Sequence, residues 1–207
     1  IRYKGFNTVK LPMLFDAAKG TAGLQEAIYE LCRRAEASVD DGVNYIILTD
    51  EGVDRDHVAI PSLLAVSAVY HHLISVQKRV QTALIVKSGE IREVMHAALL
   101  LGYGASAINP YMAFAVLDDL VKRGDVQMNY ETAESNYIKA LCKGLYKIMS
   151  KMGISTIRSY RGAKICGHRD LSPDLNHNGT IEPCEYIKQC PCFCVSVEYG
   201  YLMKDDE

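Results

Sequence analysis

The sequence lacks the long apolar segments that mark membrane and secreted proteins. Its apolar runs, such as Ala97–Leu101, are far shorter than the roughly 20 residues that a transmembrane helix needs. The first residues form no apolar segment like that of a signal peptide. A formal net charge of −2 leaves no basic excess for nucleic acid. We therefore expect a cytoplasmic protein that binds neither membranes nor nucleic acid.

Two further absences concern the start of the chain and its cysteines. No methionine stands at position 1, so we expect a fragment. The seven cysteines are an odd number without secretory context, which favours reduced or metal-bound thiols over a disulfide framework. No linker rich in Pro, Gly or Ser marks the seam near Ile165–Cys166, where the sequence changes character. Five cysteines follow residue 165: Cys166, Cys184, Cys190, Cys192 and Cys194.

Before that seam, apolar runs alternate with helical periodicity. A composition of 49% hydrophobic residues is enough to build a core. We expect strands at Val9–Ala17, Val43–Leu48, Thr82–Val86, Ala105–Asn109 and Ile154–Tyr160. We expect helices at 24–39, from Pro61 onward, and at Ile91–Leu101, Ala113–Lys122 and Ser135–Met152. This alternation predicts an α/β fold with a parallel sheet and crossover helices. The apolar run Val43–Leu48 is typical of a strand buried on both faces.

Few residues in this part suggest chemistry. The glycines Gly102 and Gly104 superficially fit a dinucleotide-binding loop, but they follow a helix and precede a strand, which favours a helix end and turn. The histidines His71, His72 and His96 lie in helical patterns, where packing is their default role.

An acidic loop follows the predicted strand at 43–48. Asp50, Asp54 and Asp56 stand at the end of that strand, where α/β proteins place functional sites. A solvated acidic loop is the favoured interpretation, with a functional site as the alternative.

Three stretches carry a family resemblance: LTDEGVDRDHVAIPSLLAVSAVYHHLI (48–74), IVKSGEIREVMHAALLLGYGASAINPYMAF (85–114) and NYIKALCKGLYKIMSKMGISTIRSYRGAKI (136–165). They closely resemble the large subunit of glutamate synthase, over residues 10–165. The resemblance implies that residues 1–125 are similar to its central domain and residues 126–165 to the start of its FMN-binding barrel.

That family forms glutamate from glutamine and 2-oxoglutarate, with FMN and an iron–sulfur cluster. The resemblance implies that this region is a spacer and part of the wall of an ammonia channel. The nucleophilic cysteine of the family, its flavin segments and its cluster cysteines have no counterparts in this sequence. We therefore transfer no catalytic residue and expect no turnover by this chain alone.

Residues 174–185 fit a twelve-residue calcium loop. Asp174, Asn176 and Asn178 occupy positions 1, 3 and 5, Thr180 offers its carbonyl at position 7, and Glu185 closes position 12. A polar Asn/Gly turn is the alternative, and Pro173 before the loop disfavours an entering helix.

The segment ICGHRDLSPDLNHNGTIEPCEYIKQCPCF (165–193) carries a second resemblance, which extends to residue 199. It resembles the C-terminal end of zinc-dependent N-acetylmuramoyl-L-alanine amidases of the phage-lysozyme type. The resemblance implies that His168 and Cys190 bind zinc and that Lys188 stabilises the oxyanion. The first zinc histidine of that family lies far upstream and has no counterpart here, so the site would be incomplete.

Three hypotheses follow for the whole chain. The leading one is a hybrid without turnover, in which a glutamate synthase fragment is fused to an amidase-like tail at residues 166–207. The second is a functioning zinc amidase that acts on peptidoglycan, and the third is a binding module stabilised by calcium or zinc. In the leading hypothesis, exposed apolar faces predict self-association or contact with the remaining glutamate synthase domains.

Overall fold

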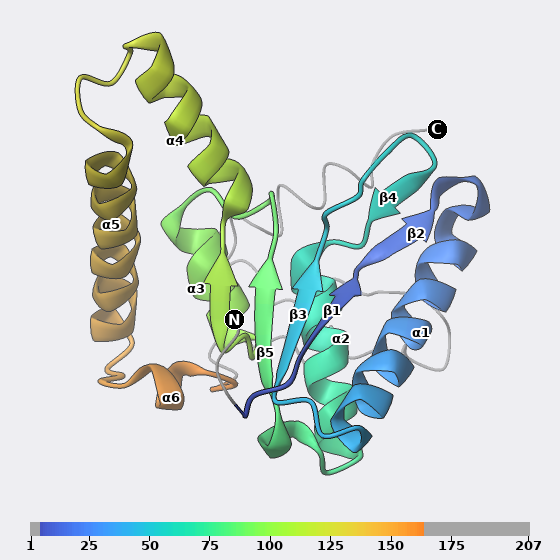
Figure 1. Cartoon of the computed structure of the whole chain (residues 1–207). Coiled ribbons are helices and arrows are strands. Elements are labelled where there is room, and N and C mark those ends of the chain that lie inside the picture. Colours follow the sequence, from blue (N-terminus) through green and yellow to red (C-terminus); the bar gives the residue numbers. More distant parts are fainter. Residues whose placement is uncertain (1–4, 164–207) are drawn as a thin grey trace, which may run out of the picture.

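The computed structural model describes residues 5–163, and these residues form an α/β fold (Figure 1). Its centre is a four-stranded parallel sheet in the order β1-β3-β5-β6. The strands are β1 (Thr8–Pro12), β3 (Tyr45–Thr49), β5 (Ala83–Lys87) and β6 (Ala107–Asn109). The crossover helices are α1 (Gly20–Asp40), α2 (Ser62–Ser75) and α3 (Val94–Gly102). The expected parallel sheet with crossover helices is therefore confirmed.

The crossover helices lie on one face of the sheet. Each successive strand pairs beside the previous one at the same edge, and right-handed connections then place every helix on the same side. α1 contacts α2, and α2 contacts α3. Figure 1 looks onto the other face and shows β3 and β5 in front of α2. This winding in one direction is the arrangement of part of a (β/α) barrel.

The core fills the space between the sheet and these helices. Alternate strand residues point toward the helices, and Leu48 and Val86 on that side are fully buried. Tyr45 and Ile47, on the other side of β3, are only partly buried. The expectation that this strand is buried on both faces is thus wrong for residues 5–163, because the crossover helices cover one face only.

The predicted strand Val9–Ala17 is in fact two strands. After β1, β2 (Leu14–Asp16) pairs antiparallel with β4 (His57–Ala59) in a separate two-stranded sheet. Met13, between β1 and β2, is fully buried, and its backbone N–H and C=O each bond to a different segment. The chain therefore leaves the parallel sheet at this residue, and only tertiary pairing decides where that happens.

The five long helices among residues 5–163 end in the same backbone motif. In each, the N–H of a residue at positive φ bonds to a carbonyl three residues back, and the next N–H bonds five residues back. The residues at positive φ are Gly42, Gln77, Gly104, Gly124 and Gly153. The interpretation of Gly102 and Gly104 as a helix end and turn is therefore confirmed.

Two further helices extend from the sheet. α4 (Tyr111–Arg123) packs against α5 (Tyr130–Lys151), and α5 also packs against α3. The α5 helix begins earlier than expected, because the Asn129 side chain caps it by accepting from the Thr132 N–H at 2.9 Å. Among residues 5–163 no helix has the length and apolar character required to cross a bilayer.

The last expected strand, Ile154–Tyr160, is wrong. Its second half is a short helix, α6 (Ile157–Tyr160), which begins where the Thr156 hydroxyl accepts from the Ser159 N–H at 3.2 Å. Tyr160 is buried beneath α3 and donates its hydroxyl to the Ala98 carbonyl at 3.1 Å. A cap and a buried aromatic anchor thus override the β propensity of the segment.

The loop after α3 yields a stability prediction. A Cβ at Gly104 would overlap the ring of Tyr70, whereas a Cβ at Gly153 would meet nothing within 4 Å, and both glycines have positive φ. We expect Gly104→Ala to lower the free energy of unfolding by about 3 kcal/mol or more, and Gly153→Ala by about 1 kcal/mol. Urea unfolding of both variants measures this difference. Equal losses would show that Tyr70 moves aside freely.

Candidate functional site

The carboxyl ends of the parallel strands bring polar residues to one edge of the sheet. The register aligns Pro12 with Thr49, Thr49 with Lys87, and Lys87 with Asn109. The residues that follow these strand ends therefore meet, and this edge is where α/β folds usually hold their sites. We take this carboxyl edge as the candidate functional site.

Asp50 is the central residue of the carboxyl edge. It follows β3 directly and is only 5% exposed. Its Oδ2 accepts from the Ser88 hydroxyl at 2.6 Å and from the Gly89 N–H at 2.8 Å. Its Oδ1 is buried and has no hydrogen-bond partner within residues 5–163. The carboxylate therefore fixes the loop after β5 to the end of β3.

A second carboxylate ties the same loop to α2. Glu90 Oε2 accepts from the Ser62 N–H at 2.8 Å and also contacts the Ser62 hydroxyl. Ser62 is the first residue of α2, whose N–H groups lack partners within the helix. Negative charge is favourable at this helix end, so Glu90 acts as a cap from a distant part of the sequence.

Glu51 joins two lysines across the open face of the sheet. Its carboxylate contacts the Lys87 ammonium directly and lies 3.6 Å from that of Lys10. The pKa of Glu51 is lowered, chiefly by the hydrogen bond from Lys87. Lys87 also lies over the ring of Tyr111, 5.3 Å from its centre. The carboxylate of Glu51 thus compensates the positive charges of both lysines.

Tyr111 stands at the start of α4 beside these acids. Its pKa is raised to about 12, first by desolvation of the hydroxyl and then by the negative charge of Asp50 and Glu51. The hydroxyl is therefore protonated at neutral pH and can serve as a donor. It cannot act there as a base.

The other titratable groups of the described chain give no catalytic constellation. His72 pairs with Glu36 at 2.8 Å, and His96 lies 3.6 Å from Glu93, which directly precedes its helix. Burial raises the pKa of the Cys32 thiol to about 11, which disfavours the reactive thiolate. No group of three or more His, Cys, Asp or Glu side chains in residues 5–163 is arranged to hold a metal.

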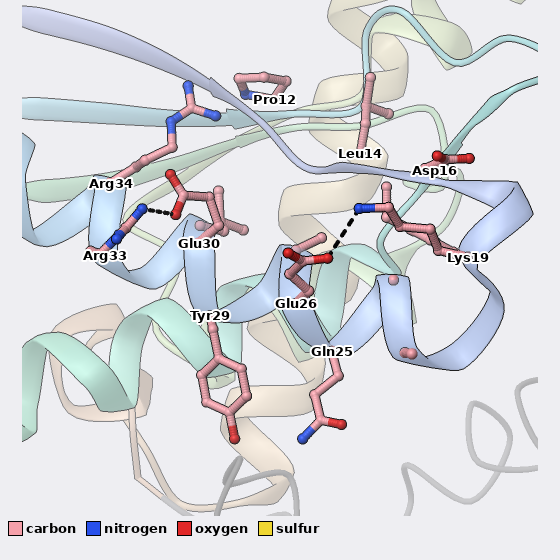
Figure 2. A pocket seen from close by; sticks show the side chains of 15 residues that line it. Pro12, Leu14, Asp16, Lys19, Gln25, Glu26, Tyr29, Glu30, Arg33 and Arg34 are labelled. Atoms are coloured by element: carbon pink, nitrogen blue, oxygen red, sulfur yellow. Dashed lines mark hydrogen bonds and ion pairs between the residues drawn. The ribbon is translucent and has the colours of Figure 1, made fainter.

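A groove also runs along α1, below β1 and β2 (Figure 2). Four of the charged residues that line it form two ion pairs, Lys19 with Glu26 at 3.1 Å and Arg33 with Glu30, and Asp16 and Arg34 line it as well. These side chains are largely exposed, so their charges are screened by water. The groove therefore offers a charged surface but no set of groups for catalysis.

The site residues inferred from the C-terminal segment lie outside the described residues. They are His168, Cys190 and Lys188 of the amidase-like site, and Asp174, Asn176, Asn178, Thr180 and Glu185 of the calcium-type loop. Zinc and calcium binding by these residues stay predictions.

The acidic loop turned out to have two parts. Asp54 and Asp56 are exposed, as the solvated interpretation expects, and Asp54 accepts from the His57 N–H at 2.7 Å to shape a turn. Asp50 is buried, so that interpretation is wrong for it. Sequence reasoning also missed Glu90 and Tyr111. The available signal was that polar residues directly follow two buried strands.

Asp50 yields the first prediction for this edge. Asp50→Ala leaves a buried hydroxyl and a backbone N–H without their acceptor, so we expect a loss of about 2–4 kcal/mol in the free energy of unfolding. The exposed neighbour Asp56 provides the control, and Asp56→Ala should change stability by no more than about 0.5 kcal/mol. Urea unfolding at neutral pH measures both, and similar values would remove the structural role of Asp50.

Tyr111 yields a pH-dependent prediction. The folded state holds its phenolic proton more tightly than the unfolded state, so its contribution to stability is complete below about pH 10. That contribution is lost as the pH rises from about 10 to about 12. In Tyr111→Phe, stability should fall less between about pH 9 and about pH 11 than in the parent. Tyr146→Phe, at a side chain that is 60% exposed, should behave like the parent. Urea unfolding at the two pH values measures the difference.

Comparison with known proteins places this chain in a family. The family described as glutamate synthase central domain matches residues 1–168. The large chain of NADPH glutamate synthase from Bacillus subtilis is 44% identical over 152 residues, which are 73% of this chain and 10% of that protein. The ferredoxin-dependent glutamate synthase of Spinacia oleracea is 39% identical over 178 residues, with 80% of this chain and 11% of that protein covered.

One solved structure has a similar fold at low identity. A mutant flavocytochrome b2 with benzoylformate aligns with a TM-score of 0.53 and 13% identity, covering 74% of this chain and 38% of that one. This likeness concerns the fold alone. The chain spans about a tenth of the length of the curated relatives named above. The family match and the identities above lead to one conclusion: this chain belongs to the glutamate synthase central domain family.

Proposed function

We propose that this chain is a structural segment of a glutamate synthase, which positions neighbouring domains and forms part of the wall along which ammonia passes. On its own it would catalyse no reaction. The observation that carries this proposal is that the acids of the carboxyl edge serve the fold. Asp50 anchors a loop, Glu90 caps α2, and Glu51 is paired with lysines.

The cofactors of the family do not fit the described part of the chain. At the carboxyl edge, Glu90 already occupies the Ser62 N–H at the start of α2 and Asp50 occupies the Gly89 N–H, so these donors are not free for the phosphate of FMN. An iron–sulfur cluster needs several cysteine thiolates, and residues 5–163 contain Cys32, which is buried, and Cys142, which is exposed. We therefore expect flavin and cluster to be held by other segments of the enzyme.

The uncovered face of the sheet supports a role beside other domains. Parallel sheets are usually covered on both faces, but the crossover helices of residues 5–163 cover only one. The remaining glutamate synthase domains are the proposed partners on this face. Self-association of the isolated chain is the alternative.

A segment exchange tests this proposal. Residues 5–163 of this chain replace the matching segment of the Bacillus subtilis large chain, and glutamate formation is assayed with glutamine and with ammonia as nitrogen source. We expect the chimera to make glutamate from both sources and the isolated chain to make none. If the exchanged segment formed a leaky wall of the ammonia passage, the glutamine-dependent rate would fall more than the ammonia-dependent rate. Only the glutamine-dependent reaction needs internal transfer of ammonia.

Two controls sharpen the exchange. The chimera with Asp50→Ala should lose both rates together with stability, whereas the chimera with Asp56→Ala should match the parent chimera. Glutamate formation by the isolated chain would contradict the proposal. So would a stably folded chimera without either activity.

A further inference from the structure

Two arginines bond to the same loop at the amino edge of the sheet, where β5 and β6 begin, opposite the carboxyl edge. Arg79 donates from Nη1 to the Thr82 carbonyl and from Nη2 to the Gly104 carbonyl, each at 2.8 Å. Arg161, directly after α6, reaches the Ser106 hydroxyl from Nη1 at 3.4 Å. Both guanidinium groups are therefore held against the loop that leads into β6.

Tyr70 of α2 holds this corner together. The Arg79 guanidinium lies 5.0 Å from the centre of its ring. A Cβ at Gly104 or at Gly162 would overlap Tyr70, so both backbones approach the tyrosine closely. The Gly162 N–H also donates to the Gly102 carbonyl at 2.8 Å, which ties the segment after Arg161 to the end of α3. The packing around Tyr70 thus fixes the positions of the segments that carry the two arginines.

No carboxylate in the described part of the chain forms an ion pair with either arginine. Within residues 5–163, neither arginine forms an ion pair with a carboxylate, and the buried Nε of each has no hydrogen-bond partner. The pKa of Arg79 is lowered, first by desolvation, while Tyr70 opposes that shift and the charge of Arg161 adds to it. Half-buried cations side by side are costly unless an anion compensates them.

We propose that Arg79 and Arg161 bind a small oxyanion, a carboxylate or a phosphate, at the amino edge of the sheet. Planar guanidinium groups match both kinds of anion, because their parallel N–H donors fit two oxygens at once. Each arginine has further N–H donors beyond those used on the loop, and the Ser106 hydroxyl is a third group at hand. Both side chains are half-buried and the Nε of each is fully buried, so an anion from solution would approach the Nη groups.

The site is independent of the proposed role in glutamate synthesis. It lies at the edge opposite Asp50 and uses none of the residues of the carboxyl edge. Its ligand would compensate the paired charge and stabilise the loop before β6.

Anion titration of the full chain tests the proposal. Inorganic phosphate and the dicarboxylate succinate are added at constant ionic strength, with chloride as the reference, and binding is followed by calorimetry and by the melting temperature. We expect at least one of the two to bind and raise the melting temperature beyond chloride. The tighter of the two identifies the natural source as phosphate or carboxylate.

Single substitutions test whether the anion binds at Arg79 and Arg161. Arg161→Gln should weaken that binding by about tenfold or more, since one charged hydrogen-bond donor group is lost. Arg158→Gln, at an exposed arginine of α6, should bind like the parent. Ser106→Ala is the second variant in case Arg161→Gln fails to fold, and it should weaken binding to a smaller but measurable extent. Absence of any effect beyond chloride, or unchanged binding in the folded variants, would overturn the proposal.

Discussion

Parallel pairing of four short strands is the constraint from which the other features of this structure follow. Parallel neighbours cannot be joined by a tight turn, so every connection must cross over the sheet as a helix. Because each strand is added at the same edge, the helices gather on one face and the core forms beneath them. The same pairing sends all strand ends of one kind to one edge. Residues far apart in the sequence, such as Asp50 and Ser88, therefore meet there.

The two edges of the sheet carry opposite charge and are built differently. At the carboxyl edge, Asp50 and Glu90 bind backbone N–H groups and so hold the loops on which they act. At the amino edge, Arg79 binds backbone carbonyls and stands beside Arg161 without a carboxylate among residues 5–163. The carboxylates of the carboxyl edge thus have partners within the fold, whereas the two arginines of the amino edge have no carboxylate partner among residues 5–163. This asymmetry is the basis of the two proposals, a structural role at one edge and an anion site at the other.

Membership in the glutamate synthase central domain family agrees with this picture of a partial structure. The chain spans about a tenth of its relatives, and its sheet winds in one direction like part of a barrel. One face of that sheet is covered by its own helices. The other carries partly buried apolar residues, such as Ile47.

The sequence by itself determined the alternation of strands and helices, the parallel sheet and the family, because periodicity and strongly matching stretches are local properties. It also located Gly104 at a helix end, because a glycine between a helix and a strand commonly takes the positive φ that ends a helix. Tertiary structure decided that Asp50 is buried while Asp56 is exposed, that one predicted strand divides at Met13, and that the segment before Tyr160 is helical. It also decided that Arg79 and Arg161 bond to the same loop before β6. These outcomes depend on contacts between residues far apart in the sequence, such as Tyr160 and Ala98, which no local pattern records.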